Sequence, residues 1–298
     1  MSRVIHTLRG RFKLKDILEV LDFPKSTYMY WQKRFDREDP DKEIKEVIMT
    51  IRKQHTDYGY RRMKKELLKY DIKINHKKLQ RLMIELDIRV KSYSRKSRKY
   101  SSYKGHVGTI APNRLNRRFD SSVPYQKITT DTTEFKYYEK DKSGHLQIKK
   151  LYLDPFMDLY NREIISFKVT KQPNGESIMA ALNDAIKATN SCQYRRTFHS
   201  DQGWAYQMRA YGEELNDNKI FQSMSRKGNC LDNSPMENFF SILKQEMYHG
   251  RIYKSYEELE KAIGNYIYYY NNYRMKEKLN WLSPIEYRLS PPYLKQSA

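Results

Sequence analysis

Three acidic residues have the type and the surroundings that metal-dependent phosphodiester chemistry needs. Asp131 lies inside a run of β-branched and aromatic residues, Asp201 ends a second such run, and Glu237 stands near the start of an apolar helical pattern. Mg²⁺ prefers carboxylate ligands, and two such ions about 3.5–4 Å apart can activate an attacking oxygen and stabilise a leaving one. If the fold brings the three carboxylates together, they form a candidate site for this chemistry.

Each of these acids also has an ordinary structural interpretation. Asp131 could pair with a lysine at a strand edge, because an unpaired carboxylate is costly to bury. Asp201 could cap the helix that follows it, and Glu237 could stabilise its own helix through the helix dipole. Considered singly, none of the three residues decides between structure and catalysis.

The composition indicates a polyanionic partner. The chain has 298 residues, which suggests about two domains, and its 57 Lys and Arg against 36 Asp and Glu give a net charge of +21. A pI near 9.6 is untypical of a cytosolic metabolic enzyme and points to nucleic acid. Hydrophobic residues make up 39% of the chain, which is enough to build a core.

Several other classes of protein are excluded. No apolar run is long enough to cross a membrane, and the first residues contain no secretory h-region. Cys192 and Cys230 are too few for a disulfide framework or a Cys-rich zinc module, and they agree with a reduced intracellular compartment.

The basic charge is concentrated in the first part of the chain. Residues 1–120 hold 32 Lys and Arg against 15 Asp and Glu, and residues 89–118 contain ten basic residues and no acidic one. A core cannot bury such a run, so residues 91–121 are predicted to be a basic linker. The linker is a solvated tether, a tether that lies along DNA phosphates, or both. Its candidate DNA contacts are Arg95, Lys96, Arg98 and Lys99.

A helical pattern precedes the linker. An apolar stripe in the first predicted helix and a candidate N-cap, Asn75, before a helix over 76–86 predict a helix-turn-helix in residues 41–90. The alternative is a small helical bundle with an incidentally basic surface. Residues 1–40 are predicted to form a further helical segment, with a pair of helices broken at Pro24. The candidate DNA-contacting side chains of the helix after Asn75 are Lys77, Lys78 and Arg81.

The pattern changes after residue 122. Three β-rich runs are followed by a helix, a strand, a helix, a strand and a last helix from Ser234, which predicts a mixed sheet with helices packed on it, an α/β domain. Asp154 and Asp158 are predicted to be solvated acids of a turn between strands. His199 is predicted to be a packing or capping histidine. The tyrosines of 267–274 are predicted to pack a helix face on the core.

Spacing and longer motifs give the three acids a shared context. Thirty-five residues separate Asp201 from Glu237, and 69 separate Asp131 from Asp201. The chain resembles the DDE transposases and retroviral-type integrases, most of all the second-reading-frame products of insertion-sequence transposases of the IS-three group. The resemblance covers roughly residues 42–288. The matching strings are TTDTTEF, HSDQGWAY, SMSRKGNCLDNSPMENFFSILKQE, YIYYYNNYRMKEKLNWLSPIEYR and, upstream, YGYRRMKKELL and INHKKLQRLM.

The resemblance implies a catalytic function and a fold. Residues 122–288 would form an RNase H-like integrase core, after the all-α helix-turn-helix region and the basic linker and before a tail over 289–298. The three acids would be the catalytic residues of a polynucleotidyl transferase and would hold two Mg²⁺ ions, for which Mn²⁺ can substitute. Water would first free a 3′-hydroxyl at the end of the mobile element, and that hydroxyl would then attack another phosphodiester. Lys244, seven residues after Glu237, would contact DNA.

The resemblance also implies partners and two alternative functions. The partners would be double-stranded DNA of the terminal inverted repeats and of the target, the first-reading-frame protein or a fusion to it, and further copies of the chain on DNA. The protein would be located in the bacterial cytoplasm, associated with the nucleoid, and would have no membrane partner. One alternative is a catalytically silent DNA-binding regulator of transposition, which the three acids disfavour. Another is a nuclease of the same fold, which the helix-turn-helix disfavours.

Overall fold

The protein divides into two compact units. The computed structural model describes residues 1–35, 38–90, 108–141, 143–227 and 229–291, and the units are Met1–Val90 and Lys91–Ala298. The candidate linker contacts Arg95, Lys96, Arg98 and Lys99 lie outside the described residues. In the part of the chain that the structure describes, no helix is long and apolar enough to cross a membrane.

The described residues of the first unit form helices and connecting turns, without a strand. Its first three helices are α1 (Ser2–Leu8), α2 (Leu14–Val20) and α3 (Lys25–Gln32), and Pro24 precedes α3 as predicted. The next three are α4 (Lys42–Gln54), α5 (Tyr60–Leu67) and α6 (His76–Glu85), with a 3₁₀ turn at Leu68–Tyr70. The side chain of Asn75 accepts a hydrogen bond from the Lys77 N–H at 3.0 Å, which confirms Asn75 as the N-cap of α6.

The second unit is built on a six-stranded sheet, in which β3 pairs with three other strands. The strands are β1 (Lys127–Thr130), β2 (Thr133–Lys140), β3 (Leu146–Asp158), β4 (Ile164–Thr170), β5 (Thr197–Ser200) and β6 (Phe221–Met224). β3 runs antiparallel to β1, β2 and β4, whereas β1 pairs in parallel with β5, and β5 in parallel with β6. The sheet is therefore mixed, as predicted.

β1 and β2 are one strand with a short interruption. Thr130 lies opposite Phe156 and Thr133 lies opposite Leu153, so both segments keep a single register on β3. That register places Asp131 opposite Pro155.

The cause of the interruption is the proline. The Leu159 N–H donates to the Lys127 carbonyl, and backbone groups alternate in direction along a strand, so Pro155 also turns its nitrogen toward the strand that carries Asp131. A proline nitrogen has no hydrogen to donate, and the ladder breaks opposite it.

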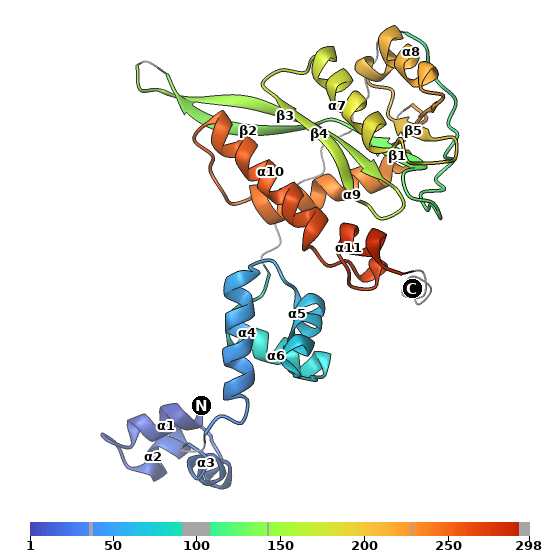
Figure 1. Ribbon diagram of the computed structural model, residues 1–298. Coiled ribbons are helices and arrows are strands. Elements are labelled where there is room, and N and C mark those ends of the chain that lie inside the picture. Colours follow the sequence, from blue (N-terminus) through green and yellow to red (C-terminus); the bar gives the residue numbers. More distant parts are fainter. Residues whose placement is uncertain (36–37, 91–107, 142, 228, 292–298) are drawn as a thin grey trace. The chain divides into compact units, whose positions relative to one another are not determined.

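Helices cover both faces of the sheet (Figure 1). α7 (Gly175–Ala188), a 3₁₀ turn (Trp204–Gln207) and α8 (Arg209–Asp217) pack on one face, in a cluster with Ile128 and Phe156. α9 (Ser234–Leu243) and α10 (Tyr256–Asn272) pack on the other, with Phe135 and Leu153. The remaining segments are a 3₁₀ turn at Cys230–Asn233, a π-helical segment at Lys244–Tyr248, a 3₁₀ turn at Glu277–Leu279 and α11 (Pro284–Leu289). The mixed sheet with helices on both faces confirms the predicted RNase H-like fold class.

Two predictions about this unit have clear outcomes. Tyr270 is buried against the sheet and Tyr269 packs on the same cluster, whereas Tyr268 and Tyr273 are exposed, so the prediction that the tyrosine-rich segment packs on the core is correct for two of its tyrosines. The prediction that Asp154 and Asp158 are solvated turn acids is wrong. Both are almost fully buried on β3, because that strand continues through them to pair with β1 and β4.

Candidate active site

Asp131 lies at the interruption between β1 and β2. Its Oδ1 accepts a hydrogen bond from the Thr132 N–H at 2.8 Å. Burial raises the pKa of Asp131 well above its usual range, and the negative charges of Asp201, Glu237 and Asp154 raise this pKa further. The carboxyl group is therefore within electrostatic reach of three other acids, each from a different element.

Asp201 directly follows β5, the parallel neighbour of β1. Thr129 lies opposite His199, so the same register places Asp131 and Asp201 side by side where the two strands end. Burial raises the pKa of Asp201, and its Oδ1 accepts a hydrogen bond from the Gly203 N–H at 2.8 Å. A Cβ at residue 203 would lie 2.9 Å from this oxygen, so any larger residue there would displace the carboxylate from its present position.

Glu237 stands in the first turn of α9, on the opposite layer from α7. The residue as a whole is exposed. Its carboxyl group is nevertheless partly desolvated by its neighbours, and this desolvation raises the pKa of Glu237. Its place in the first turn also fits the helix-dipole interpretation, and the two roles are compatible.

The metal-binding chemistry has partial support in this arrangement. The donor set consists of carboxylate oxygens whose mutual repulsion raises the pKa of Asp131, and a divalent cation would relieve that repulsion. Among the described residues, however, no group of three or more His, Cys, Asp or Glu side chains is arranged to hold a metal ion. Coordination by Asp131, Asp201 and Glu237 stays a prediction.

Asn233 ties the start of α9 to the strand that carries Asp131. Its Oδ1 accepts from the Thr129 hydroxyl at 2.5 Å, and its Nδ2 donates to the Thr130 carbonyl at 3.0 Å. Asn233 is buried, so both bonds are protected from water. The bridge fixes where α9 begins, four residues before Glu237.

Asp232 anchors the segment just before Asn233. It is buried, and it accepts hydrogen bonds from Arg226 Nε at 2.8 Å and Arg117 Nε at 2.8 Å. These two guanidinium groups, Arg226 foremost, hold the pKa of Asp232 well below its usual range. Asp232 and Asn233 both lie in a matching string, but their role could not be predicted, because partners such as Arg117 and Thr129 lie far away along the chain.

His199 braces the same segment from the sheet. Its Nδ1 lies 2.8 Å from the Ser223 hydroxyl, and its Nε2 lies 2.9 Å from the Asp232 carbonyl oxygen. Burial lowers the pKa of His199 to about 4, so the ring is neutral near pH 7. The prediction of a packing histidine is confirmed.

A buried hydroxyl network lies on the other side of Asp131. The Thr132 hydroxyl donates to Asp154 Oδ1 at 2.6 Å and lies 3.4 Å from the Tyr206 hydroxyl. Burial raises the pKa of Asp154, and it raises that of Tyr206 well above its usual range. The network was not predicted, because Asp154 was expected to lie in a turn and not on a strand.

The candidate DNA contact Lys244 lies near the first acid. α9 ends at Leu243, and a π-helical segment begins at Lys244, so the helix geometry changes there. The Lys244 Nζ donates to the Thr133 hydroxyl at 2.6 Å and lies 5.0 Å from the centre of the Phe135 ring. Contact of Lys244 with DNA stays a prediction.

The candidate DNA contacts on α6 differ in their surroundings. Lys78 and Arg81 both pair with Asp41, at 2.5 Å and 3.0 Å, so their charge helps to join α6 to the start of α4. Lys77 is exposed.

Comparison with known proteins gives concordant matches. Two family models described as "Integrase core domain" match residues 121–230 and 237–290, and one described as "HTH-like domain" matches residues 38–97.

Two relatives and one solved structure illustrate the similarity. The "Putative transposase InsK for insertion sequence element IS150" of Escherichia coli is 39% identical over 287 residues, covering 96% of this chain and 97% of the relative. An "Uncharacterized transposase-like protein" of Haemophilus influenzae is 48% identical, covering 74% of this chain and 96% of its own. The HTLV-2 integrase catalytic core domain in complex with magnesium is 16% identical, covering 52% of this chain and 92% of its own, with a TM-score of 0.38. The chain therefore belongs to the IS3 family of insertion-sequence transposases, with an integrase core and a helix-turn-helix domain.

Proposed function

We propose that the chain cleaves phosphodiester bonds at the ends of a mobile element and joins the freed 3′-hydroxyl to DNA by two-metal transesterification. The observation that carries this proposal is the register of β1 and β5, which sets Asp131 beside Asp201. The influence of the Glu237 charge on the pKa of Asp131 supports adding the third acid. The integrase-core match over residues 121–230 agrees with this reaction class.

In this proposal Asp131, Asp201 and Glu237 hold two Mg²⁺ ions, or Mn²⁺ in their place. When bound, the ions supply activation of the attacking oxygen and stabilisation of the leaving oxygen. The chain's own groups set the geometry, since Asn233 and His199 fix the segment that leads into α9. Burial and the neighbouring acids raise the pKa of Asp131, so a nearby cation would lower this pKa again and favour the carboxylate form. The Lys244 ammonium group, bonded to Thr133, offers positive charge to a DNA phosphate.

Binding of double-stranded DNA belongs to the same proposal. The helix-turn-helix of residues 41–90 and the linker of 91–121 would bind the element ends and the target, and the core of 122–288 would cut. We propose the first-reading-frame product, or a fusion to it, as a partner, and several copies of the chain on DNA. The relatives named above come from bacteria, so we place the reaction in the bacterial cytoplasm.

A DNA-binding regulator without catalysis is the second candidate. It is favoured by the finding that, within the described ranges, three acids are not grouped closely enough to hold a metal ion. The regulator and the transposase predict the same DNA binding and differ only in cleavage.

The deciding experiment incubates the purified chain with labelled duplex DNA of its own element ends, with Mg²⁺ and with EDTA. The transposase predicts cleavage with Mg²⁺ only. Asp201→Asn should abolish cleavage and leave binding intact, whereas Asp217→Asn, at the exposed end of α8, serves as the matched control. Cleavage by Asp201→Asn would remove this residue from the site. Binding without any cleavage by the unaltered chain would favour the regulator.

A further inference from the structure

The first 35 residues form a small helical unit with a core of its own, ahead of the segment that matches the helix-turn-helix family. Ile5, Ile17, Leu18 and Tyr28 are buried together, with Phe23 packed against them. α2 has seven residues and α3 has eight, and four residues, 21–24, join them. Two short helices joined by a turn of three or four residues are typical of a helix-turn-helix.

The joining turn has a defined conformation. Asp22 adopts a left-handed φ of 45°, which aspartate tolerates better than most residues. Pro24 follows with φ near its fixed value and sets the start of α3. The turn is therefore short and constrained, as a helix-turn-helix needs in order to present its second helix.

Tyr28 sets which side of α3 faces outward. Its side chain is fully buried, and its hydroxyl accepts a hydrogen bond from Arg9 Nη1 at 3.2 Å and lies 3.2 Å from His6 Nδ1. Successive helical residues turn by about 100°, so the side of α3 opposite Tyr28 carries Ser26, Tyr30 and Lys33. All three are exposed.

The outward face of α3 has the chemistry of a DNA-reading helix. It presents a hydroxyl group, an aromatic ring and an ammonium group, and the guanidinium of Arg34 lies 3.6 Å from the centre of the Tyr30 ring. α3 contains no acidic residue. Hydroxyl and aromatic side chains can contact base edges and thymine methyl groups, and a lysine can bind phosphate or guanine.

Charge favours DNA over a protein as the occupant of this face. Residues 1–35 contain eight Lys and Arg, and their three acids, Asp16, Glu19 and Asp22, lie on α2 or in the turn. On α6, by contrast, Lys78 and Arg81 are already paired with Asp41. Lys33 is exposed, so its ammonium group can contact a polyanion.

We propose that α3 is a second DNA-reading helix, which inserts into the major groove of double-stranded DNA. The chain then reads a duplex with two separate segments, residues 1–35 and residues 38–90. The inference relies on the proposed function only in taking element DNA as the biological target, since the binding itself needs neither metal nor cleavage.

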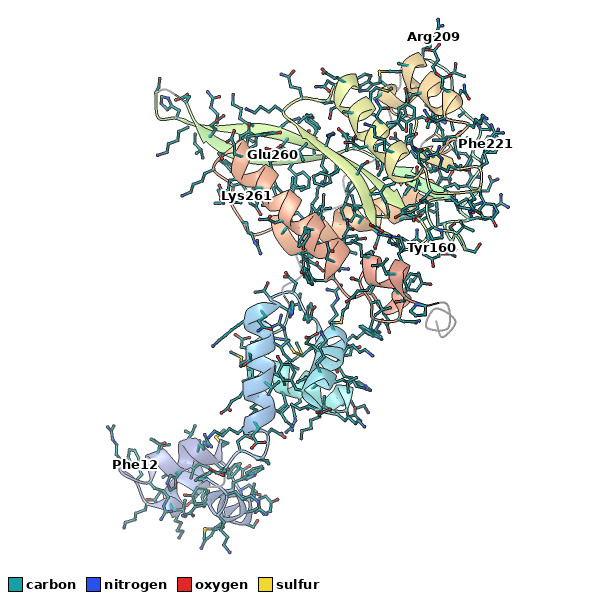
Figure 2. All side chains as sticks on the ribbon, viewed as in Figure 1. Phe12, Tyr160, Arg209, Phe221, Glu260 and Lys261 are labelled. Atoms are coloured by element: carbon teal, nitrogen blue, oxygen red, sulfur yellow. The ribbon has the colours of Figure 1, made fainter. Side chains whose placement is uncertain are left out.

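The test selects duplexes from a random-sequence pool with the full chain in EDTA, and then measures affinity for the selected duplex. The α3 variant is Tyr30→Ala with Lys33→Ala. The matched control is Phe12→Ala with Lys15→Ala, which also removes one exposed aromatic ring and one lysine; Phe12, labelled in Figure 2, is 60% exposed, and Tyr30 is 53% exposed. Both variants change exposed side chains, so thermal unfolding should match that of the unaltered chain.

We expect the α3 variant to lose about tenfold or more in affinity for the selected duplex and to lose one block of preferred base pairs. The control should keep both blocks. Equal losses in the two variants, or an unchanged selected sequence, would overturn the proposal. A change confined to self-association, measured by sedimentation, would assign the face to a protein partner instead. Because the assay contains no Mg²⁺, its outcome is independent of whether the chain cuts DNA.

Discussion

At the scale of single residues, burial decides the protonation of the acids on β3. Asp158 is fully buried, and its two oxygens accept hydrogen bonds from the Tyr125 and Tyr160 N–H groups at 2.9 Å and 3.0 Å. These bonds favour the carboxylate, but burial outweighs them and raises the pKa of Asp158 to about 6. The residue therefore couples the stability of the core to pH.

The folded protein binds the Asp158 proton more tightly than the unfolded chain does. The contribution of this group to the free energy of unfolding should therefore fall as pH rises from about 4 to about 6, by roughly 2–3 kcal/mol. Asp158→Asn cannot titrate, so the difference in unfolding free energy between the two proteins should change across this window. Denaturant unfolding at several pH values measures it. A pH-independent difference would show that the pKa of Asp158 is not raised.

Local sequence could identify the three candidate acids but not all of their neighbours. Asp131, Asp201 and Glu237 are recognisable from residue type, flanking pattern and spacing, which are properties of the chain itself. The burial of Asp154 is not, because it depends on β3 continuing as one long strand between β2 and β4, which the local composition around Asp154 does not reveal. A proline within an Asp-Pro pair signals a turn by composition, and tertiary pairing overrides that signal here.

At the scale of elements, two features position the candidate acids: the interruption between β1 and β2, and the hydrogen bonds of Asn233 that join the start of α9 to β1. Pro155 denies a hydrogen bond to the strand opposite it, and Asp131 occupies the resulting gap. The sequence predicted a single strand through Asp131, because the proline responsible lies on another strand. The break became evident only from the register.

Pro155→Val should close this gap. Valine supplies the missing N–H and suits a strand, so stability should be unchanged or higher while β1 and β2 merge. Merging the two strands should displace the Asp131 carboxyl group. This displacement should lower Mg²⁺-dependent cleavage by about ten- to a hundredfold. Cleavage assays and unfolding curves of the two proteins test this. Full cleavage by a variant that folds normally would count against a role for the interruption.

Asn233→Ala tests the bridge between α9 and β1. The change removes two buried hydrogen bonds and leaves the Thr130 carbonyl without this partner, so we expect a loss of about 1–3 kcal/mol in the free energy of unfolding. Glu237 should then be less well positioned, and the rise in melting temperature on adding Mg²⁺ should shrink. Asn272→Ala, which removes a single hydrogen bond from a half-buried side chain on α10 to the Tyr268 carbonyl, is the control. An unaltered Mg²⁺ response would place the bridge outside the metal-binding function.

At the scale of the whole molecule, most of the net positive charge and the three candidate acids lie in different parts of the chain. Residues 1–107 hold 29 Lys and Arg against 14 Asp and Glu, and residues 108–298 hold 28 against 22. Asn113 and Arg117 bind Asp232, so the segment after residue 108 belongs with the core and its removal would disturb the site. A cut before residue 108 therefore separates most of the net positive charge from the acids.

The salt dependence of DNA binding should report this division. Each phosphate neutralised by a lysine or arginine releases counterions. Each such contact makes the plot of the logarithm of the association constant against the logarithm of the salt concentration steeper by about 0.9. The full chain should show a steep slope with a non-specific duplex, and the 108–298 fragment a much flatter one, because it carries few unbalanced cations. Circular dichroism of the fragment checks that its core is folded. Equal slopes from a folded fragment would locate the phosphate contacts on the core instead, around groups such as Lys244.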